Sequence, residues 1–140
     1  MKKVVLSVAL VLSIILILCA CADKNVASNP WDSATYKENT EFGSGSTTVV
    51  VKLVVQDKTV DFTINTDKTT LGDALLEHKL ISGENSTYGL YVKVVNGIEA
   101  DYNKTNSYWA FTKDGTSLLT GVDGEKISSG NKYEIIYTEN

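Results

Sequence analysis

The chain has 140 residues, of which 17 are acidic and 13 are basic. The resulting net charge of -4 at pH 7 argues against nucleic-acid and polybasic membrane-surface roles, which need clustered positive charge. Every basic residue is a lysine, so the bidentate clamps that arginine forms on phosphates and carboxylates are excluded as well.

The first residues have the features of a bacterial export signal. A lysine pair follows Met1, and an apolar run of about fifteen residues covers positions 4–18, whereas a transmembrane helix needs roughly 20. The run ends in Leu-Cys-Ala-Cys, the pattern of a lipoprotein cleavage site, which closes at Cys21. We therefore predict a lipoprotein signal peptide over residues 1–20 and lipid on Cys21, which would anchor the chain to the outer face of the cell membrane. An uncleaved membrane anchor and an ordinary secretory signal are the alternatives.

This prediction excludes any further role for the two cysteines in the mature chain. Cleavage before Cys19 would place the bulky Leu18 where the small Ala20 fits better, so Cys19 leaves with the signal. Because Cys21 carries the lipid, the mature chain has no thiol for a disulfide, a catalytic thiolate or a cysteine zinc site.

Residues 21–46 are predicted to be the lipidated cysteine and a flexible tether. The stretch is polar, contains a proline and two glycines, and has no apolar period. A linker of this kind reaches roughly 25 to 30 Å. Trp31, Tyr36 and Phe42 are unusual in a tether. They indicate loose packing against the domain, no role at all, or a peptide docking motif.

Residues 47–140 are predicted to form one domain, which begins with a hairpin. The β-branched run 47–56 and the alternating run 59–65 are typical of two strands joined by a turn. Thr70, with Asp73 three residues later, then predicts the start of a helix that Gly83 ends. The core-facing stripe of this helix would contain Leu71, Ala74, Leu75 and His78, widened by Leu76 and Leu80.

His78 is the one histidine, and it has no second ligand at helical spacing. We expect it at the border of the helix, with its imidazole in solvent. The chain has no Gly-x-Ser-x-Gly sequence, and its aspartates are spread among turns. We therefore predict no catalytic residues, no metal site and no enzymatic activity.

The remaining segments predict further strands and an α+β fold. Asn96-Gly97 is a strong hairpin signal, and a second turn is expected at Asp114-Gly115. A hairpin, a short helix and then several strands predict a β-grasp-like mixed sheet with the helix on one face. The predicted strands cover residues 90–95, 98–102, 107–113, 117–122 and 133–138.

The aromatic residues are the main candidates for a binding surface. Alternation along 107–113 sends Tyr108 to one face of the strand and Trp109 and Phe111 to the other, so one set should be at least half exposed. Exposed aromatic side chains beside glycine-rich turns suit a flat amphipathic ligand or a protein partner. Packing at a sheet edge is the alternative.

These residues resemble the transcobalamin-like carboxy-terminal domain, found in bacterial surface lipoproteins and as the smaller β-domain of animal cobalamin carriers. The resemblance covers about Val49 to Tyr137. Its marks are the segments 70–75, 88–92, 95–97, 107–111 and 120–122, followed by Ile127 and Gly130.

The resemblance implies a ligand surface for cobalamin or another corrinoid. In the animal carriers the corrinoid lies between a large helical domain and the β-domain, so a lone β-domain should bind weakly unless another subunit or protein covers the second face. No covalent cofactor is expected. Carried over to this chain, the ligand-binding residues would be Tyr88, Gly89, Leu90, Tyr91, Tyr108, Trp109, Leu119 and Thr120.

The sequence therefore favours a surface-anchored ligand-binding module. Its expected partners are the membrane, through the lipid on Cys21, a corrinoid, and a membrane transporter or second binding domain. The alternative is a cell-surface adhesion or assembly module that binds protein or polysaccharide.

Overall fold

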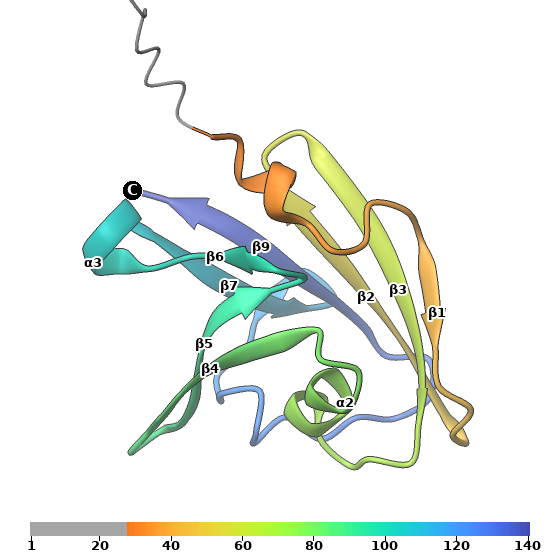
Figure 1. Ribbon diagram of the computed structural model, residues 1–140. Coiled ribbons are helices and arrows are strands. Elements are labelled where there is room, and N and C mark those ends of the chain that lie inside the picture. The colour runs from red at the N-terminus through yellow and green to blue at the C-terminus, as the bar shows by residue number, and fades with distance from the viewer. Residues whose placement is uncertain (1–27) are drawn as a thin grey trace, which may run out of the picture.

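The computed structural model describes residues 28–140, so the predicted signal peptide and the lipidation site at Cys21 lie outside the described residues. Within residues 28–140, no helix is long and apolar enough to cross a membrane. The elements, drawn in Figure 1, are the 3-10 helix η2 Pro30–Ser33, β1 Thr40–Phe42, β2 Thr47–Val55, β3 Lys58–Thr66, α2 Leu71–Glu77, β4 Ile81–Ser86, β5 Gly89–Val95, β6 Ile98–Glu99, α3 Tyr102–Thr105, β7 Ser107–Lys113, β8 Thr116–Ser117 and β9 Lys132–Glu139.

Six strands form the larger sheet, in the order β1-β3-β2-β9-β7-β8. The β2–β3 hairpin is antiparallel, whereas β9 runs parallel to β2 and antiparallel to β7, so the sheet is mixed. Alternate residues of β2 and β3 point to one face and are buried, as the period of two along a strand requires. The predicted hairpin and the α+β class are confirmed.

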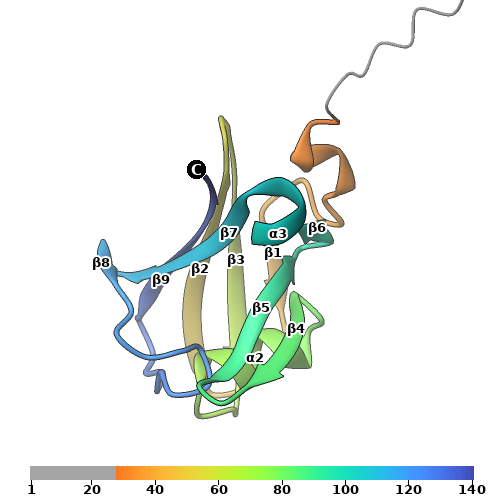
Figure 2. The same cartoon turned by 90° about the vertical axis from the view of Figure 1, so that its left-hand side faces the viewer.

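The smaller sheet, β4-β5-β6, lies with α2 on the buried face of the larger sheet (Figure 2). The core fills the space between the two layers. From the smaller layer it receives mainly leucine, isoleucine and valine side chains, all almost completely buried: Leu71, Leu75, Leu80, Ile81, Val95 and Ile98.

Helix α2 begins as predicted but ends earlier. The Thr70 hydroxyl accepts a hydrogen bond from the Asp73 amide at 3.2 Å, which caps the first turn. The helix ends at Glu77, and Lys79 has a left-handed backbone with φ of 55°. The prediction that it continues to Gly83 is wrong, because Ile81–Ser86 pairs with β5 as strand β4. The strand pairing outweighs the helical spacing of Leu76 and Leu80, and Leu76 is exposed.

Residues 28–46 pack on the domain, so the prediction of a tether is wrong over this range. We call residues 28–46 the N-terminal strap. Its strand β1 pairs in parallel with β3, and Phe42 packs edge-on against Phe62 at 5.7 Å between ring centroids. Trp31 and Tyr36 also pack against the core, which supports the first of the three readings of these aromatic residues. Burial of apolar surface therefore orders a segment whose composition is typical of a linker.

The two predicted turns are confirmed, and the segments after them are shorter than expected. Asn96-Gly97 and Asp114-Gly115 both have two consecutive positive φ angles, as tight hairpins require. The strand expected over 98–102 ends at Glu99, and the four-residue helix α3 follows. Most of the strand expected over 117–122 is a loop instead.

Candidate functional site

A cleft of about 260 Å³ lies between strands β5 and β7 and is closed at one end by the loop after β8. Four of the eight predicted ligand-binding residues line it. We call residues 118–124 the cleft loop. The lining residues are Leu90, Tyr91, Val92, Trp109, Phe111, Leu118, Thr120, Gly121 and Val122.

The cleft exists because two strands lack a partner along part of one side. β5 pairs with β4 along its length, but it pairs with β6 only at Val94 and Val95. β7 pairs with β9 along its length, but it pairs with β8 only at Thr112 and Lys113. The remaining parts of β5 and β7 border the cleft, with side chains rather than hydrogen-bonded strands between them.

Trp109 forms the fixed part of the cleft wall. Only 6% of its surface is exposed, and its ring packs edge-on against Tyr137 at 5.2 Å between centroids. Its indole Nε1 donates a hydrogen bond to the Lys93 carbonyl at 3.2 Å. The indole is therefore held in one orientation, with one part of the side chain lining the cleft.

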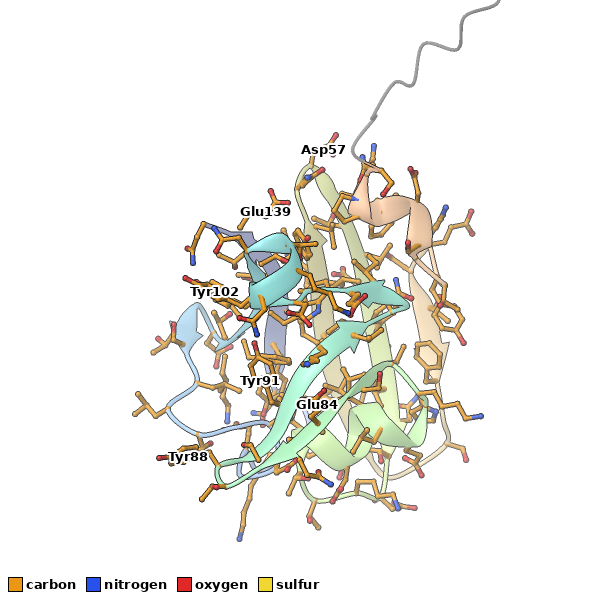
Figure 3. All side chains as sticks on the ribbon, turned by 60° about the vertical axis from the view of Figure 1, so that its left-hand side comes forward. Asp57, Glu84, Tyr88, Tyr91, Tyr102 and Glu139 are labelled. Carbon is orange, nitrogen blue, oxygen red and sulfur yellow. The ribbon has the colours of Figure 1, made fainter. Side chains whose placement is uncertain are left out.

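Exposed apolar side chains flank the lining residues in the chain. Tyr88 is 93% exposed and Leu119 is 100% exposed, although both are large and apolar enough to be expected in a core. Tyr91 is 44% exposed and lies on the same strand as the cleft wall (Figure 3). Together with the half-buried Leu90 and Phe111, these side chains make an apolar surface that is accessible to a ligand.

Glycine shapes the turn that carries Tyr88. Gly89 begins β5 with φ of 99°, a conformation that side chains with a Cβ rarely adopt. The Ser86 hydroxyl donates to the Gly89 carbonyl at 2.7 Å and accepts from the Tyr88 amide at 3.2 Å. The turn is thus held locally while the phenol of Tyr88 stays in solvent.

The cleft loop is hydrogen-bonded to three elements. Leu118 donates to the Phe111 carbonyl of β7 at 3.0 Å, and the Gly72 amide of α2 donates to the Val122 carbonyl at 2.9 Å. The carboxylate of Asp123 accepts from the Leu90 amide of β5 at 2.8 Å. The loop therefore connects both walls of the cleft.

Charged groups near the cleft are paired with each other. Lys93 contacts Glu84 at 2.9 Å and Asp101 at 3.7 Å, and the hydrogen bond to Glu84 is the largest cause that raises the pKa of Lys93. Burial opposes ionisation of Asp101, but backbone hydrogen bonds from Asn103 and Lys104 and the charge of Lys93 lower its pKa. None of the nine lining residues is itself charged, so the cleft favours an uncharged surface of a ligand.

Four of the eight predicted site residues line the cleft, and three others are their neighbours in the chain. Leu90, Tyr91, Trp109 and Thr120 line it, and Tyr88, Gly89 and Leu119 adjoin them in the chain. Tyr108 does not line it, because the strand alternation turns Tyr108 away from Trp109. Of these two, the buried side chain is Trp109.

Five lining residues and the nearby Asp123 lie outside the eight predicted residues, although Leu118 and Gly121 belong to the same turn as the predicted Leu119 and Thr120. Phe111 could have been found, since it lies two positions after Trp109 and shares its face. Val92, Val122 and Asp123 gave no such signal, because their positions depend on contacts between segments far apart in the sequence.

His78 lies elsewhere, at the C-cap of α2, and its side chain is partly buried, with 18% of its surface exposed. Its ring lies 5.4 Å from that of Phe42, and within the described part of the chain its Nε2 is buried without a hydrogen-bond partner. The N-terminal strap covers it. Among residues 28–140, no three histidine, cysteine, aspartate or glutamate side chains group closely enough to hold a metal ion.

Three other hollows are larger, but each has at least one charged lining residue, whereas the cleft has none. One, of about 420 Å³, lies on the outer face of the larger sheet and is lined by charged residues that include Lys52, Asp61 and Glu134. Another, of about 610 Å³, lies beside Pro30, Gln56 and Glu139.

Comparison with known families matches residues 68–139, more than half of the chain, to the family described as Domain of unknown function (DUF4430). The chain belongs to this family. The matched range of the DUF4430 domain includes α2, both cleft walls and the cleft loop, whereas the N-terminal strap and the β2–β3 hairpin precede it. No curated protein matches the chain.

Two solved structures are similar to the DUF4430 domain. A candidate metal-binding protein from Ruminococcus gnavus ATCC 29149 matches with a TM-score of 0.63 and 29% identity, over 68% of this chain and 99% of that chain. Haptocorrin in complex with Cbi, cobinamide, matches with a TM-score of 0.57 and 17% identity, over 70% of this chain and 26% of haptocorrin. The DUF4430 domain therefore has a transcobalamin-like fold.

Proposed function

We propose that the domain is a ligand-binding module, and that its ligand is a flat amphipathic molecule for which a corrinoid is the leading candidate. The observation that carries the proposal is the cleft itself, whose uncharged lining includes Trp109 and Tyr91 and is flanked in the chain by the exposed Tyr88 and Leu119. Apolar and aromatic linings with a few polar groups are typical of small-molecule sites. The corrinoid bound to haptocorrin supports the choice of ligand.

The size of the cleft supports a shared binding site. Its volume of about 260 Å³ is below the roughly 300 to 1,000 Å³ of pockets that enclose a drug-sized ligand. The matched region is also only 26% of haptocorrin. We therefore propose that one face of the ligand lies on this domain and that a transporter or a second binding domain covers the other face.

We also propose that the chain is a lipoprotein anchored through Cys21 outside the cell membrane, where it would pass its ligand to a transporter. The Leu-Cys-Ala-Cys sequence supports this placement. We propose binding without catalysis, since the lining contains no histidine, cysteine or acidic side chain to act as a general acid, a base or a nucleophile.

Titration of residues 22–140 with cobinamide and cobalamin tests the proposal. Trp31→Phe leaves Trp109 as the one tryptophan, and we expect its fluorescence to be quenched as ligand binds. Tyr88→Ala and Leu119→Ala should weaken binding several-fold each, by about 1 kcal/mol. Tyr102→Ala is the matched control, because Tyr102 is an exposed tyrosine outside the cleft. No binding at millimolar ligand removes the corrinoid from the proposal.

An adhesion or assembly module is the second candidate. The complete exposure of Leu119 favours it, since an apolar side chain projecting from a loop is a common contact in protein interfaces. Envelope extract captured on the immobilised domain separates the two functions. A partner protein that Leu119→Ala no longer captures, together with no corrinoid-induced change in fluorescence, favours adhesion.

A further inference from the structure

We propose that Asp123 is a clasp that joins the two walls of the cleft and controls how firmly a ligand is retained; the part that concerns the ligand rests on the function proposed above. Asp123 lies outside the cleft lining and would act as a positioning residue. Its side chain links the cleft loop to β5 through the Leu90 amide.

The hydrogen bond lies where the cleft has no strand to hold it together. At Leu90, β5 is paired only with β4, and the Asp123 Oδ2 atom accepts the Leu90 amide at 2.8 Å on the remaining side. The Asp123 carboxylate thus accepts the backbone hydrogen bond that a neighbouring strand would otherwise accept. Hydrogen bonds to an ionised acceptor are roughly twice as strong as neutral ones, which suits a single contact of this kind.

Two glycines leave the space that the carboxylate occupies. A Cβ atom at Gly89 would lie 3.1 Å from Asp123 Oδ2, and a Cβ atom at Gly72 would lie 2.6 Å from Asp123 Oδ1. The second distance is shorter than real Cβ contacts allow. Both glycines therefore border the Asp123 carboxylate, and Gly89 is favoured in addition by its φ of 99°.

The other bonds of the cleft loop do not join it to β5. Leu118 is bonded to β7, Val122 is bonded to α2, and Gly124 donates to Gly121 within the loop at 3.0 Å. Loss of the Asp123 carboxylate should therefore leave the cleft loop in place but remove its hydrogen bond to β5. A planar macrocycle larger than the cleft would then dissociate more easily.

The first test observes the hydrogen bond directly. In the full chain in detergent, the Leu90 amide proton should move upfield in NMR spectra of Asp123→Ala, because its hydrogen-bond acceptor is lost. Asp123→Asn, which keeps an acceptor oxygen, should move this resonance less. A Leu90 amide resonance that is unchanged in Asp123→Ala overturns the clasp.

The second test separates the clasp from the ligand. In the Trp31→Phe background without ligand, Asp123→Ala should increase acrylamide quenching of Trp109, whereas Asp123→Asn, which keeps an acceptor oxygen, should stay near the parent value. Gly72→Ala should behave like Asp123→Ala, because its methyl group displaces the carboxylate. Circular dichroism checks that each variant is folded.

Ligand kinetics complete the design. We expect the cobinamide dissociation rate of Asp123→Ala to rise about tenfold, the change expected from losing one charge-assisted hydrogen bond. Unchanged quenching and an unchanged dissociation rate overturn the clasp. Increased quenching in a protein that binds no corrinoid supports the clasp and rejects the proposed ligand.

Discussion

Asn96 connects the N-terminal strap to the smaller sheet. Its side-chain oxygen accepts from the Tyr36 amide at 2.8 Å, and its side-chain nitrogen donates to the Tyr36 carbonyl at 2.8 Å. Its own carbonyl accepts from Thr35 at 2.8 Å. Asn96 is almost completely buried, so these bonds are shielded from water. A turn residue thereby also serves as the attachment point of a distant segment.

Replacing Asn96 separates these two roles. Asn96→Gly keeps the left-handed turn, where φ is 51°, but loses two side-chain hydrogen bonds, and we expect the free energy of unfolding to fall by about 2 to 3 kcal/mol. Asn96→Ala should lose about 1 kcal/mol more, because alanine is strained in this conformation. Urea denaturation measures both. A Gly variant as stable as the parent would contradict the role of the side chain.

Glu125 should make stability depend on pH. Burial opposes its ionisation, but hydrogen bonds from Lys113 at 2.8 Å and Tyr133 at 2.9 Å outweigh burial and hold the pKa of Glu125 below its usual 4.5. The same contact and burial raise the pKa of Tyr133 well above its usual range. Because the pKa of Glu125 is lower in the folded chain, its contribution is complete above about pH 4.5 and is lost as pH falls through the folded value.

Unfolding measured at several pH values checks this. Glu125→Gln should be less stable than the parent at pH 7, and the difference should shrink as the pH is lowered below 4.5. Glu38→Gln, at an exposed position, is the matched control and should follow the parent at every pH. A difference for Glu125→Gln that stays constant with pH would show that its ionisation contributes nothing.

At the scale of elements, the N-terminal strap completes the domain. Phe42 of β1 contacts Phe62 and His78, and Tyr36 packs on Phe42 at 5.1 Å. A fragment of residues 47–140 should therefore be less stable than residues 28–140 by at least about 3 kcal/mol. Thermal unfolding followed by circular dichroism compares the two fragments. Equal melting temperatures would mean that the strap is dispensable.

Sequence patterns predicted the elements that depend on local chemistry. The strand over Ser107–Lys113, the start of α2 at Thr70 and the Asn96-Gly97 turn follow from alternation, capping and turn residues. The end of α2 and the strap could not be predicted, since both depend on pairing with distant strands.

The candidate site was predictable to a similar extent. The aromatic residues and the Tyr88-Gly89 turn were identified from their types and from the resemblance, and Tyr91 and Trp109 among them line the cleft. Which of Tyr108 and Trp109 is buried was left open, because alternation places them on opposite faces without saying which face meets the core. Asp123 looked like one of many turn aspartates, and only its contact with Leu90 distinguishes it.

At the scale of the whole molecule, the described residues begin at one end of the domain and the cleft lies near the other. Ser28 and η2 lie beside the β2–β3 turn, where Figure 3 labels Asp57, whereas Tyr88 is at the far end in the same view. Figure 1 agrees, with the first described residues at the top and the β4–β5 turn at the bottom. Attachment at the N-terminal end should therefore leave the cleft accessible.

Immobilisation through one chosen position tests whether the cleft lies at the end opposite residue 28. Residues 22–140 contain no cysteine, so Asp57→Cys and Leu119→Cys each provide a single point of attachment. The domain coupled through position 57 should keep its capacity for cobinamide, and the domain coupled through position 119 should lose most of it. Equal capacity in the two orientations would place the ligand elsewhere.

Because these two ends are far apart, the distance of the domain from its point of attachment can change without changing the cleft. A spacer inserted before residue 28 would change how far the domain stands from whatever carries it, but it would alter no residue that faces the ligand. Variants with segments of different length before residue 28 would place the cleft at different distances from the attachment point and keep the same affinity.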